Sequence, residues 1–255
     1  MELLKVARRR SFLSEVMYVL LNALVVAAIV ITVIVTAAPW YAFLLIALSK
    51  WRVFAVRTRF WAANIRANMV DTIVGLSTVI LVYTASGSLL TQIILGLLYL
   101  GWLLLVKPRS SHGAIVAQGA IGLFLGICAI MQLSANWPAS LVVLLCWAVG
   151  YSAARHILSV EHETHLNFLS LLWGFIVAEI AWLSYHWTIG YNLPGHIKLP
   201  QGAVIIALLG FLAERVHASY QRDGKVQLSE VLLPTLLSVG VIAVILFVFG
   251  SVPSI

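Results

Sequence analysis

The chain has 255 residues, of which 62% are apolar and only 10% are charged, with a net charge of +7. A soluble domain carries about 45–50% apolar and about 25% charged residues, so this composition excludes a soluble enzyme, a disordered tail, a disulfide-rich secreted domain and a nucleic-acid-binding protein. It predicts an all-α polytopic transmembrane bundle that forms a single integral membrane domain over residues 1–255.

The apolar stretches predict about nine transmembrane helices, because each span needs about 20 apolar residues. In chain order the predicted spans are Val16–Ala38, Trp40–Val56, Met69–Ser86, Leu89–Val106, Gly113–Leu133, Pro138–Ala154, Leu166–Trp187, Gln201–Ser219 and Glu230–Gly250. Pro39, Pro138 and Pro200 stand where helices are expected to begin, a position that proline favours.

The second predicted span, Trp40–Val56, is the weakest, because it is short and contains Lys50 and Arg52. With nine crossings and the amino terminus inside, fifteen of the sixteen bases fall inside and only Lys198 falls outside. Without this crossing, five bases fall inside and eleven outside. The positive-inside bias therefore predicts nine crossings, with the carboxyl terminus outside. Lys50 and Arg52 are then expected to extend toward the inner headgroups.

The segment Lys50–Arg66, which overlaps the end of the second span, is basic. Three arginines interleave there with three aromatic residues: Arg57, Arg59 and Arg66 with Phe54, Phe60 and Trp61. This mixture is typical of a segment that lies in the membrane interface. The bases of the chain serve mainly as orientation signals. The bilayer is the expected partner, and a further hypothesis, compatible with that role, is that anionic headgroups contact these arginines at the inner face.

The third span opens with a polar stripe of Asn64, Asn68, Asp71, Gly75 and Thr78, spaced four, three, four and three residues apart. That spacing predicts one continuous helix face. Such a face must meet a partner helix or a water-filled cavity rather than lipid, and both alternatives stay open. Asp71 near the helix start also complements the helix dipole.

The segment Glu161–His165 holds the densest histidine cluster. His162 and His165 are three residues apart, whereas the metalloprotease signature needs two histidines four apart. The pair is a weak candidate for a metal, because a short inner loop ordinarily carries solvated histidines. No lysine lies deep in a span to hold a Schiff base. The sequence therefore predicts no metal site and no cofactor.

Glu179 lies about midway along Leu166–Trp187, deeper than any other acid. An ionised carboxylate at the bilayer centre costs at least about 2.5 kcal/mol, so we expect Glu179 to face protein, to pair or to be protonated. Trp182 and His186 follow on the same helix face. Glu179 and His186 predict a proton or cation path; the alternative is a protonated Glu179 that bonds a neighbouring helix.

Three classes of function remain. The first is a small transporter or an ion- or proton-conducting protein, with Glu179, His186, Asn64, Asn68 and Asp71 along the path. The second is a non-catalytic membrane scaffold, subunit or assembly factor. The third, least favoured, is a membrane-embedded enzyme for a lipid-linked substrate, because the inner histidines and acids form no recognised spacing. The expected location is the plasma (inner) membrane of a prokaryote, and the sequence leaves protein partners open.

Overall fold

A computed structural model of the chain describes residues 12–160, 163–187 and 189–248 as a helical bundle. The helices are α2 (Phe12–Thr36), α3 (Trp40–Ser49), α4 (Trp61–Ala67), α5 (Met69–Thr84), α6 (Leu89–Gly101), α7 (His112–Leu133), α8 (Ala139–Leu158), α9 (Leu166–His186), α10 (Gln201–Asp223) and α11 (Leu228–Val248). Short turns of 3-10 helix are η1 (Trp51–Val53), η2 (Thr58–Phe60) and η4 (Ser134–Asn136), and η3 (Trp102–Val106) is a π-helical turn. The all-α prediction is confirmed, apart from a hairpin of two three-residue strands, β1 (Gly190–Asn192) and β2 (Lys198–Pro200).

Seven of the described helices are long and apolar enough to cross a membrane, and the bent pair α4–α5 can supply an eighth. The chain is thus a multi-pass membrane protein. The predicted second span is helical only from Trp40 to Ser49, and 3-10 turns follow. Ten helical residues rise about 15 Å, which is half of the hydrocarbon core of about 30 Å. The prediction of a full-length helical span over Trp40–Val56 is therefore wrong in its extent.

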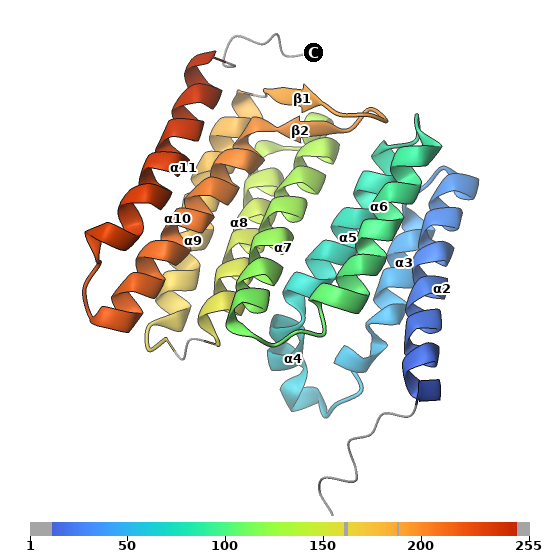
Figure 1. The fold of residues 1–255 in the computed structure, drawn as a ribbon. Helices are drawn as coiled ribbons and strands as arrows, with labels where there is room; N and C mark the ends of the chain where they lie inside the picture. Colours follow the sequence, from blue (N-terminus) through green and yellow to red (C-terminus); the bar gives the residue numbers. More distant parts are fainter. Residues whose placement is uncertain (1–11, 161–162, 188, 249–255) are drawn as a thin grey trace, which may run out of the picture.

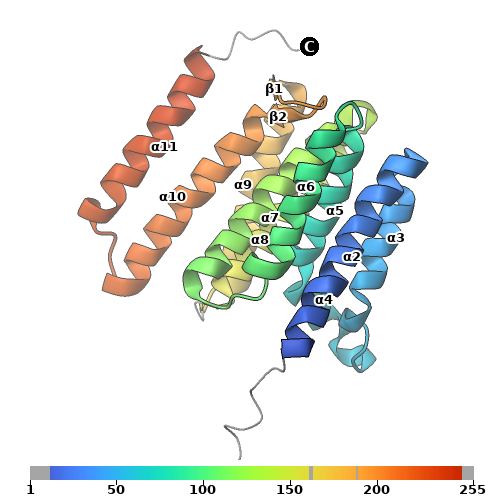
Figure 2. The ribbon, with the colours of Figure 1, turned by 45° about the vertical axis from the view of Figure 1, so that its right-hand side comes forward.

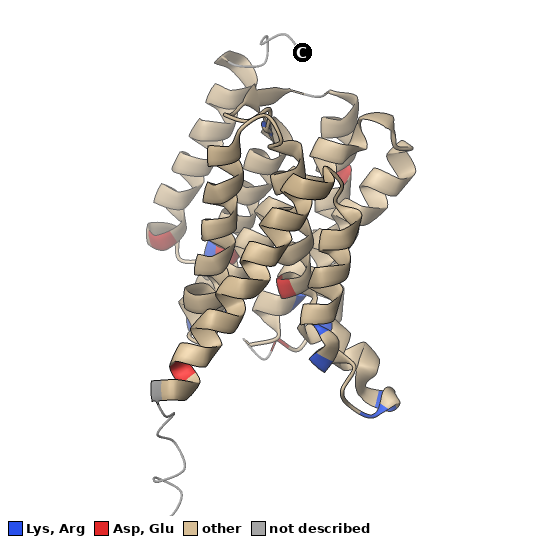
Figure 3. Ribbon diagram, turned by 90° about the vertical axis from the view of Figure 1, so that its right-hand side faces the viewer, with Lys and Arg blue, Asp and Glu red and all other residues tan. Residues whose placement is uncertain are grey.

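Successive helices run alternately up and down the bundle when the short α3 is counted and α4 is left aside (Figure 1). The first described residues of α2 lie at the end where α4 projects, here called the α4 end, whereas α11 finishes at the opposite end. The β1–β2 hairpin covers that opposite end, here called the hairpin end. Figure 3 shows most Lys and Arg positions toward the α4 end. Lys198 on β2 is the exception among the described bases, as the positive-inside analysis predicts.

Two apolar cores hold the bundle together. One joins α2, α3, α5 and α6, and the other joins α7, α8, α9 and α10. Figure 1 shows these two groups side by side, and Figure 2 shows α10 and α11 along one edge of the bundle. Glycines of α7 bring the cores together: an added Cβ would lie 2.8 Å from Val70 of α5 at Gly122 and 3.0 Å from Ile73 of α5 at Gly126. Within the second core, the added Cβ at Gly126 would also lie 2.7 Å from Val149 of α8. These close approaches fix α5, α7 and α8 against one another.

Candidate functional site

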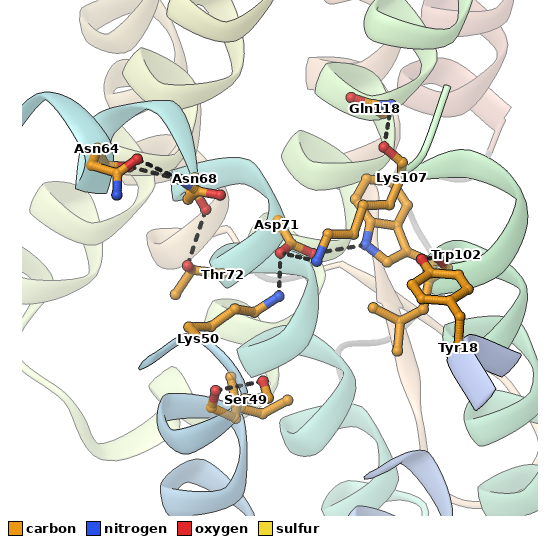
Figure 4. Close-up of polar contacts among 12 residues, drawn as sticks. Tyr18, Ser49, Lys50, Asn64, Asn68, Asp71, Thr72, Trp102, Lys107 and Gln118 are labelled. Atoms are coloured by element: carbon orange, nitrogen blue, oxygen red, sulfur yellow. Dashed lines mark hydrogen bonds and ion pairs between the residues drawn. The ribbon is translucent and has the colours of Figure 1, made fainter. Parts of the chain in front are cut away.

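A charged cluster surrounds Asp71 in the first turn of α5 (Figure 4). Its Oδ2 atom accepts hydrogen bonds from the ammonium groups of Lys50 and Lys107, the latter at 2.8 Å. The indole Nε1 of Trp102 lies 3.2 Å from Oδ1 and donates to it. The Asp71 side chain is only 11% exposed. This buried carboxylate therefore lies largely out of solvent and has protein donors at both of its oxygens.

Three backbone interruptions meet at this carboxylate. Helix α3 ends at Ser49, directly before Lys50, and the helix that carries Asp71 is bent by 62° at Asn68. The π turn lies between Trp102 and Lys107, where the N–H of Lys107 donates to the carbonyl of Trp102 at 2.9 Å. This i to i−5 bond is the signature of a π turn, a feature that recurs at functional sites. The turn brings Trp102 and Lys107 to the same carboxylate.

The π turn is held from α7. Gln118 of α7 donates its amide Nε2 to the carbonyl of Val106 at 2.8 Å, and to that of Arg109 at 2.9 Å. Its Oε1 atom lies 2.9 Å from His156 Nε2 of α8. A backbone carbonyl freed by an irregular helix needs such a partner inside a membrane. Gln118 thus links the Asp71 cluster to the second core.

The cluster holds two ammonium groups and one carboxylate, so its formal charge is +1. The Lys50 side chain is 10% exposed and that of Lys107 is 40% exposed. One lysine is therefore enclosed and the other reaches the surface near the α4 end. The single carboxylate therefore has two cationic partners.

The prediction that Lys50 extends to the headgroups is wrong, because its ammonium turns inward to Asp71. Sequence analysis missed Lys50, Trp102 and Lys107 as site residues. A signal was present: Lys50, Asp71 and Lys107 all lie at the inner ends of predicted spans, and so at one depth. A shared depth in the membrane does not indicate which span ends lie next to one another in the bundle.

The polar stripe is not one continuous helix face, because the helix is interrupted at Asn68. The Asn68 side chain donates to the carbonyl of Asn64 at 2.8 Å, and such a side-chain bond competes with regular helix formation. Asn64 itself donates to the carbonyl of Val53 at 2.7 Å, and so ties α4 to η1. Asn64 and Asn68 thus shape the bend beside Asp71, and their place on a transport path stays a prediction.

Glu179 lies on the outer flank of α9 and is exposed. It lines an open hollow of about 470 Å³, together with the apolar residues Val143, Phe175, Ala178, Trp182 and Leu183. It makes no hydrogen bond or ion pair with any residue that the structure describes. Of the three expectations for Glu179, the described chain provides neither a protein environment nor a pairing partner, and protonation is left. The place of Glu179 and His186 on a proton or cation path stays a prediction.

The physical reason lies in the packing of α9 on α8. An added Cβ at Gly150 of α8 would lie 2.8 Å from Val177, so the face of α9 with Val177 and Ala181 meets α8 closely. Glu179 follows Val177 by two residues and points away from that face. His186 is exposed near the end of the same helix, with its ring 4.8 Å from that of Trp182. The structure thus keeps Glu179 and His186 apart from the Asp71 cluster, which lies toward the α4 end.

The weak metal pair is only partly visible, because His162 lies outside the described residues. His165 is exposed, and its backbone N–H donates to Glu163 Oε1 at 3.1 Å. This bond lowers the pKa of the Glu163 carboxyl below its ordinary value. Over the described ranges, no three His, Cys, Asp or Glu side chains are grouped so that they can hold a metal ion.

Comparison with protein-family models, with curated proteins and with solved structures finds no match for the chain.

Proposed function

We propose that the protein is a small transporter or ion-conducting protein, that protons are the ion it handles, and that the Asp71 cluster is the site. The observation that carries this proposal is a buried carboxylate shared by Lys50 and Lys107 where three helix interruptions meet. Ionisable groups inside membrane proteins commonly mark ion pathways, and transporters bind ions where helices are discontinuous.

The chemistry requires that one proton leave the cluster and another enter it. Lys107 is the more exposed lysine and exchanges its proton with the adjoining aqueous phase. When Lys107 is neutral, Asp71 remains paired with Lys50 and with the Trp102 indole, so no unpaired charge is left in the membrane. The cluster then has two accessible states, with formal charges of +1 and zero.

We also propose nine passes with the amino terminus inside, in the plasma membrane of a prokaryote. The alternating helix directions and the gathering of bases near the α4 end support this orientation (Figures 1 and 3). In this topology α3 is a short pass whose inner end is completed by the Lys50–Asp71 pair. The α4 end then faces the cytoplasm, and Lys107 exchanges protons on that side.

The test measures proton flux into proteoliposomes that contain a pH-sensitive dye. A potassium gradient with valinomycin, which makes the membrane permeable to potassium, sets the membrane potential that drives the flux. The wild-type protein is expected to carry protons well above the rate of empty liposomes, and Lys107→Gln to lower that rate at least tenfold. Arg109→Gln is the matched control, because it removes a nearby exposed base outside the cluster. Wild-type flux no higher than that of empty liposomes, in either direction of the potential, would contradict the proposal.

Glu179 and His186 remain the alternative path, and the same assay separates it from the Asp71 cluster. Glu179→Gln is expected to leave the flux unchanged, because this carboxyl lies on the outer flank in the described structure. Loss of flux in Glu179→Gln, with Lys107→Gln unaffected, would move the site from Asp71 to Glu179.

A second candidate function is a non-catalytic membrane subunit that binds another transmembrane helix at Glu179. The outward carboxyl in an apolar hollow favours it, since such a group needs a hydrogen-bond donor once it lies in lipid. A photoreactive residue at Leu183 is then expected to cross-link a second polypeptide in native membranes, and Glu179→Leu to abolish the adduct. Adducts to lipid alone would contradict this candidate.

A further inference from the structure

The segment between α3 and α5, residues 51–67, forms a compact projection at the α4 end of the bundle (Figure 1). We call it the basic elbow. From residue 50 to residue 70 the sequence has no acid but five bases: Lys50, Arg52, Arg57, Arg59 and Arg66. Lys50 is occupied by Asp71, and the four arginines of the elbow are exposed. The elbow therefore presents cationic groups that no acid of its own neutralises.

Large apolar side chains accompany these arginines on the surface. Six of them are between 37% and 61% exposed: Trp51, Phe54, Val56, Phe60, Trp61 and Ile65. Exposed apolar area costs about 25 cal/mol per Å² in water, so a segment of this composition favours a place where the area is covered. The boundary between headgroups and acyl chains covers aromatic side chains and keeps guanidinium groups near phosphate.

The elbow has a defined internal structure. The indole Nε1 of Trp61 donates to the carbonyls of Phe54 and Val56, at 3.2 Å and 3.0 Å. The rings of Phe54 and Trp61 meet edge to face at 5.5 Å. The Asn64–Val53 bond closes the loop, and the Lys50–Asp71 pair holds its beginning beside the start of α5. The arginines are therefore presented on a fixed frame.

The guanidinium groups retain donors for an external anion. The guanidinium groups of Arg52 and Arg57 make no hydrogen bond or ion pair within the described part of the chain. Arg59 lies over the Phe60 ring at 4.6 Å, and Arg66 uses only its Nε, which donates to the carbonyl of Ala62 at 3.1 Å. A planar guanidinium donates two parallel hydrogen bonds to a phosphate, which is a geometry that lysine lacks.

We propose that the basic elbow binds the phosphate groups of anionic phospholipids in the leaflet on its side of the membrane. Arg57 and Arg59 contact the phosphates, and the neighbouring aromatic side chains insert beneath the headgroups. Charge complementarity selects the anionic lipid, since each arginine near an anionic surface adds to the attraction. This inference does not depend on proton movement at Asp71.

The test uses the purified full-length protein in a neutral detergent, titrated with phosphatidylglycerol or phosphatidylcholine and followed by native mass spectrometry. Phosphatidylglycerol is expected to bind at least tenfold more tightly than phosphatidylcholine. The double substitution Arg57→Gln with Arg59→Gln should lower the ratio of the two lipid affinities about tenfold. Arg109→Gln with Lys225→Gln is the matched control: it removes two exposed bases outside the elbow and should change the preference less than twofold.

Charge removal can also disturb insertion, so Arg57→Lys with Arg59→Lys serves as a second pair that keeps the orientation signal. It should retain part of the preference, because charge remains while the planar donors are lost. Equal affinity for the two lipids would overturn the proposal, and so would an equal loss in the Arg109/Lys225 control. Displacement of the lipid by millimolar inorganic phosphate, or by an acidic peptide, would assign the site to a soluble anion instead.

Discussion

Asp71 and Glu179 are both carboxylates in apolar helices, yet their surroundings in the bundle are opposite. Asp71 is enclosed and accepts from two ammonium groups and an indole. Glu179 lies on an open flank and bonds to no described residue. The sequence makes Glu179 the more unusual acid because of its depth, whereas the structure gives the organised electrostatic environment to Asp71.

The difference lies in what neighbouring elements bring to each helix. Asp71 stands at a helix start, where the ends of α3 and of the π turn also arrive with their lysines. Glu179 stands within a regular helix whose packed face is made of small and β-branched residues. Charged partners gather at span ends, where long cationic side chains are tolerated, so a mid-span acid has few partners within its own chain.

The largest effect is expected from Asp71→Ala. It leaves the ammonium of Lys50, whose side chain is 10% exposed, without a counter-charge. Removal of one partner of a buried pair costs about 3–5 kcal/mol, so the free energy of unfolding in detergent should fall by that amount. Asp71→Leu combined with Lys50→Met should recover most of the loss, because the uncompensated buried charge is gone. An unfolding free energy of Asp71→Ala within about 0.5 kcal/mol of wild type would remove the contrast with Glu179.

The next effect concerns the packing that turns Glu179 outward. In Gly150→Ala the new Cβ would meet Val177 at 2.8 Å, so α8 and α9 must separate. Overpacking of this kind costs about 1–3 kcal/mol, and thermal unfolding should report the loss. Gly240→Ala in α11 is the control, because nothing lies within 4 Å of its added Cβ. Equal stability of the two variants would contradict the close α8–α9 contact.

A smaller effect is expected at Glu163, an acid in the loop before α9. Its pKa lies below the ordinary 4.5, chiefly because the backbone N–H of His165 donates to the carboxylate. The folded state therefore gains stability from this group above pH 4.5 and loses it as the pH falls through the lowered pKa. The melting temperature of wild type should exceed that of Glu163→Gln by roughly 1–3 °C at neutral pH, and the gap should close in acid. A gap that is constant with pH would contradict this assignment.

The smallest effect is expected from Glu179→Leu. Because this carboxyl has no partner among the described residues, its loss should change the unfolding free energy of the isolated protein by no more than about 0.5 kcal/mol. Chemical denaturation of Glu179→Leu and Asp71→Ala under the same conditions compares the two losses of unfolding free energy directly. A loss as large as that of Asp71→Ala would mean that Glu179 supports the fold.

Much of the fold was predictable because spans are encoded locally. The predicted span Leu89–Val106 matches α6 with its π turn, and Gly113–Leu133 matches α7 to within one residue. The short α3 was not predictable, because its apolar run continues beyond Ser49 while the helix does not. The bend at Asn68 was missed for a related reason: regular spacing of polar residues is the same whether a helix continues or breaks.

The amino-acid sequence was enough to predict the membrane class, the approximate limits of most helices and the gathering of bases toward one end; the nine predicted spans compare with seven or eight candidate spans among the described residues. These properties follow from the length, apolarity and charge of each segment taken singly, because the partition of a segment between water and lipid depends on its own residues. Tertiary structure alone decided that Lys50 turns inward, that Trp102 and Lys107 join Asp71, and that Glu179 faces outward. These outcomes depend on the rotation of each helix about its axis and on which helix ends meet, and packing between distant segments sets both.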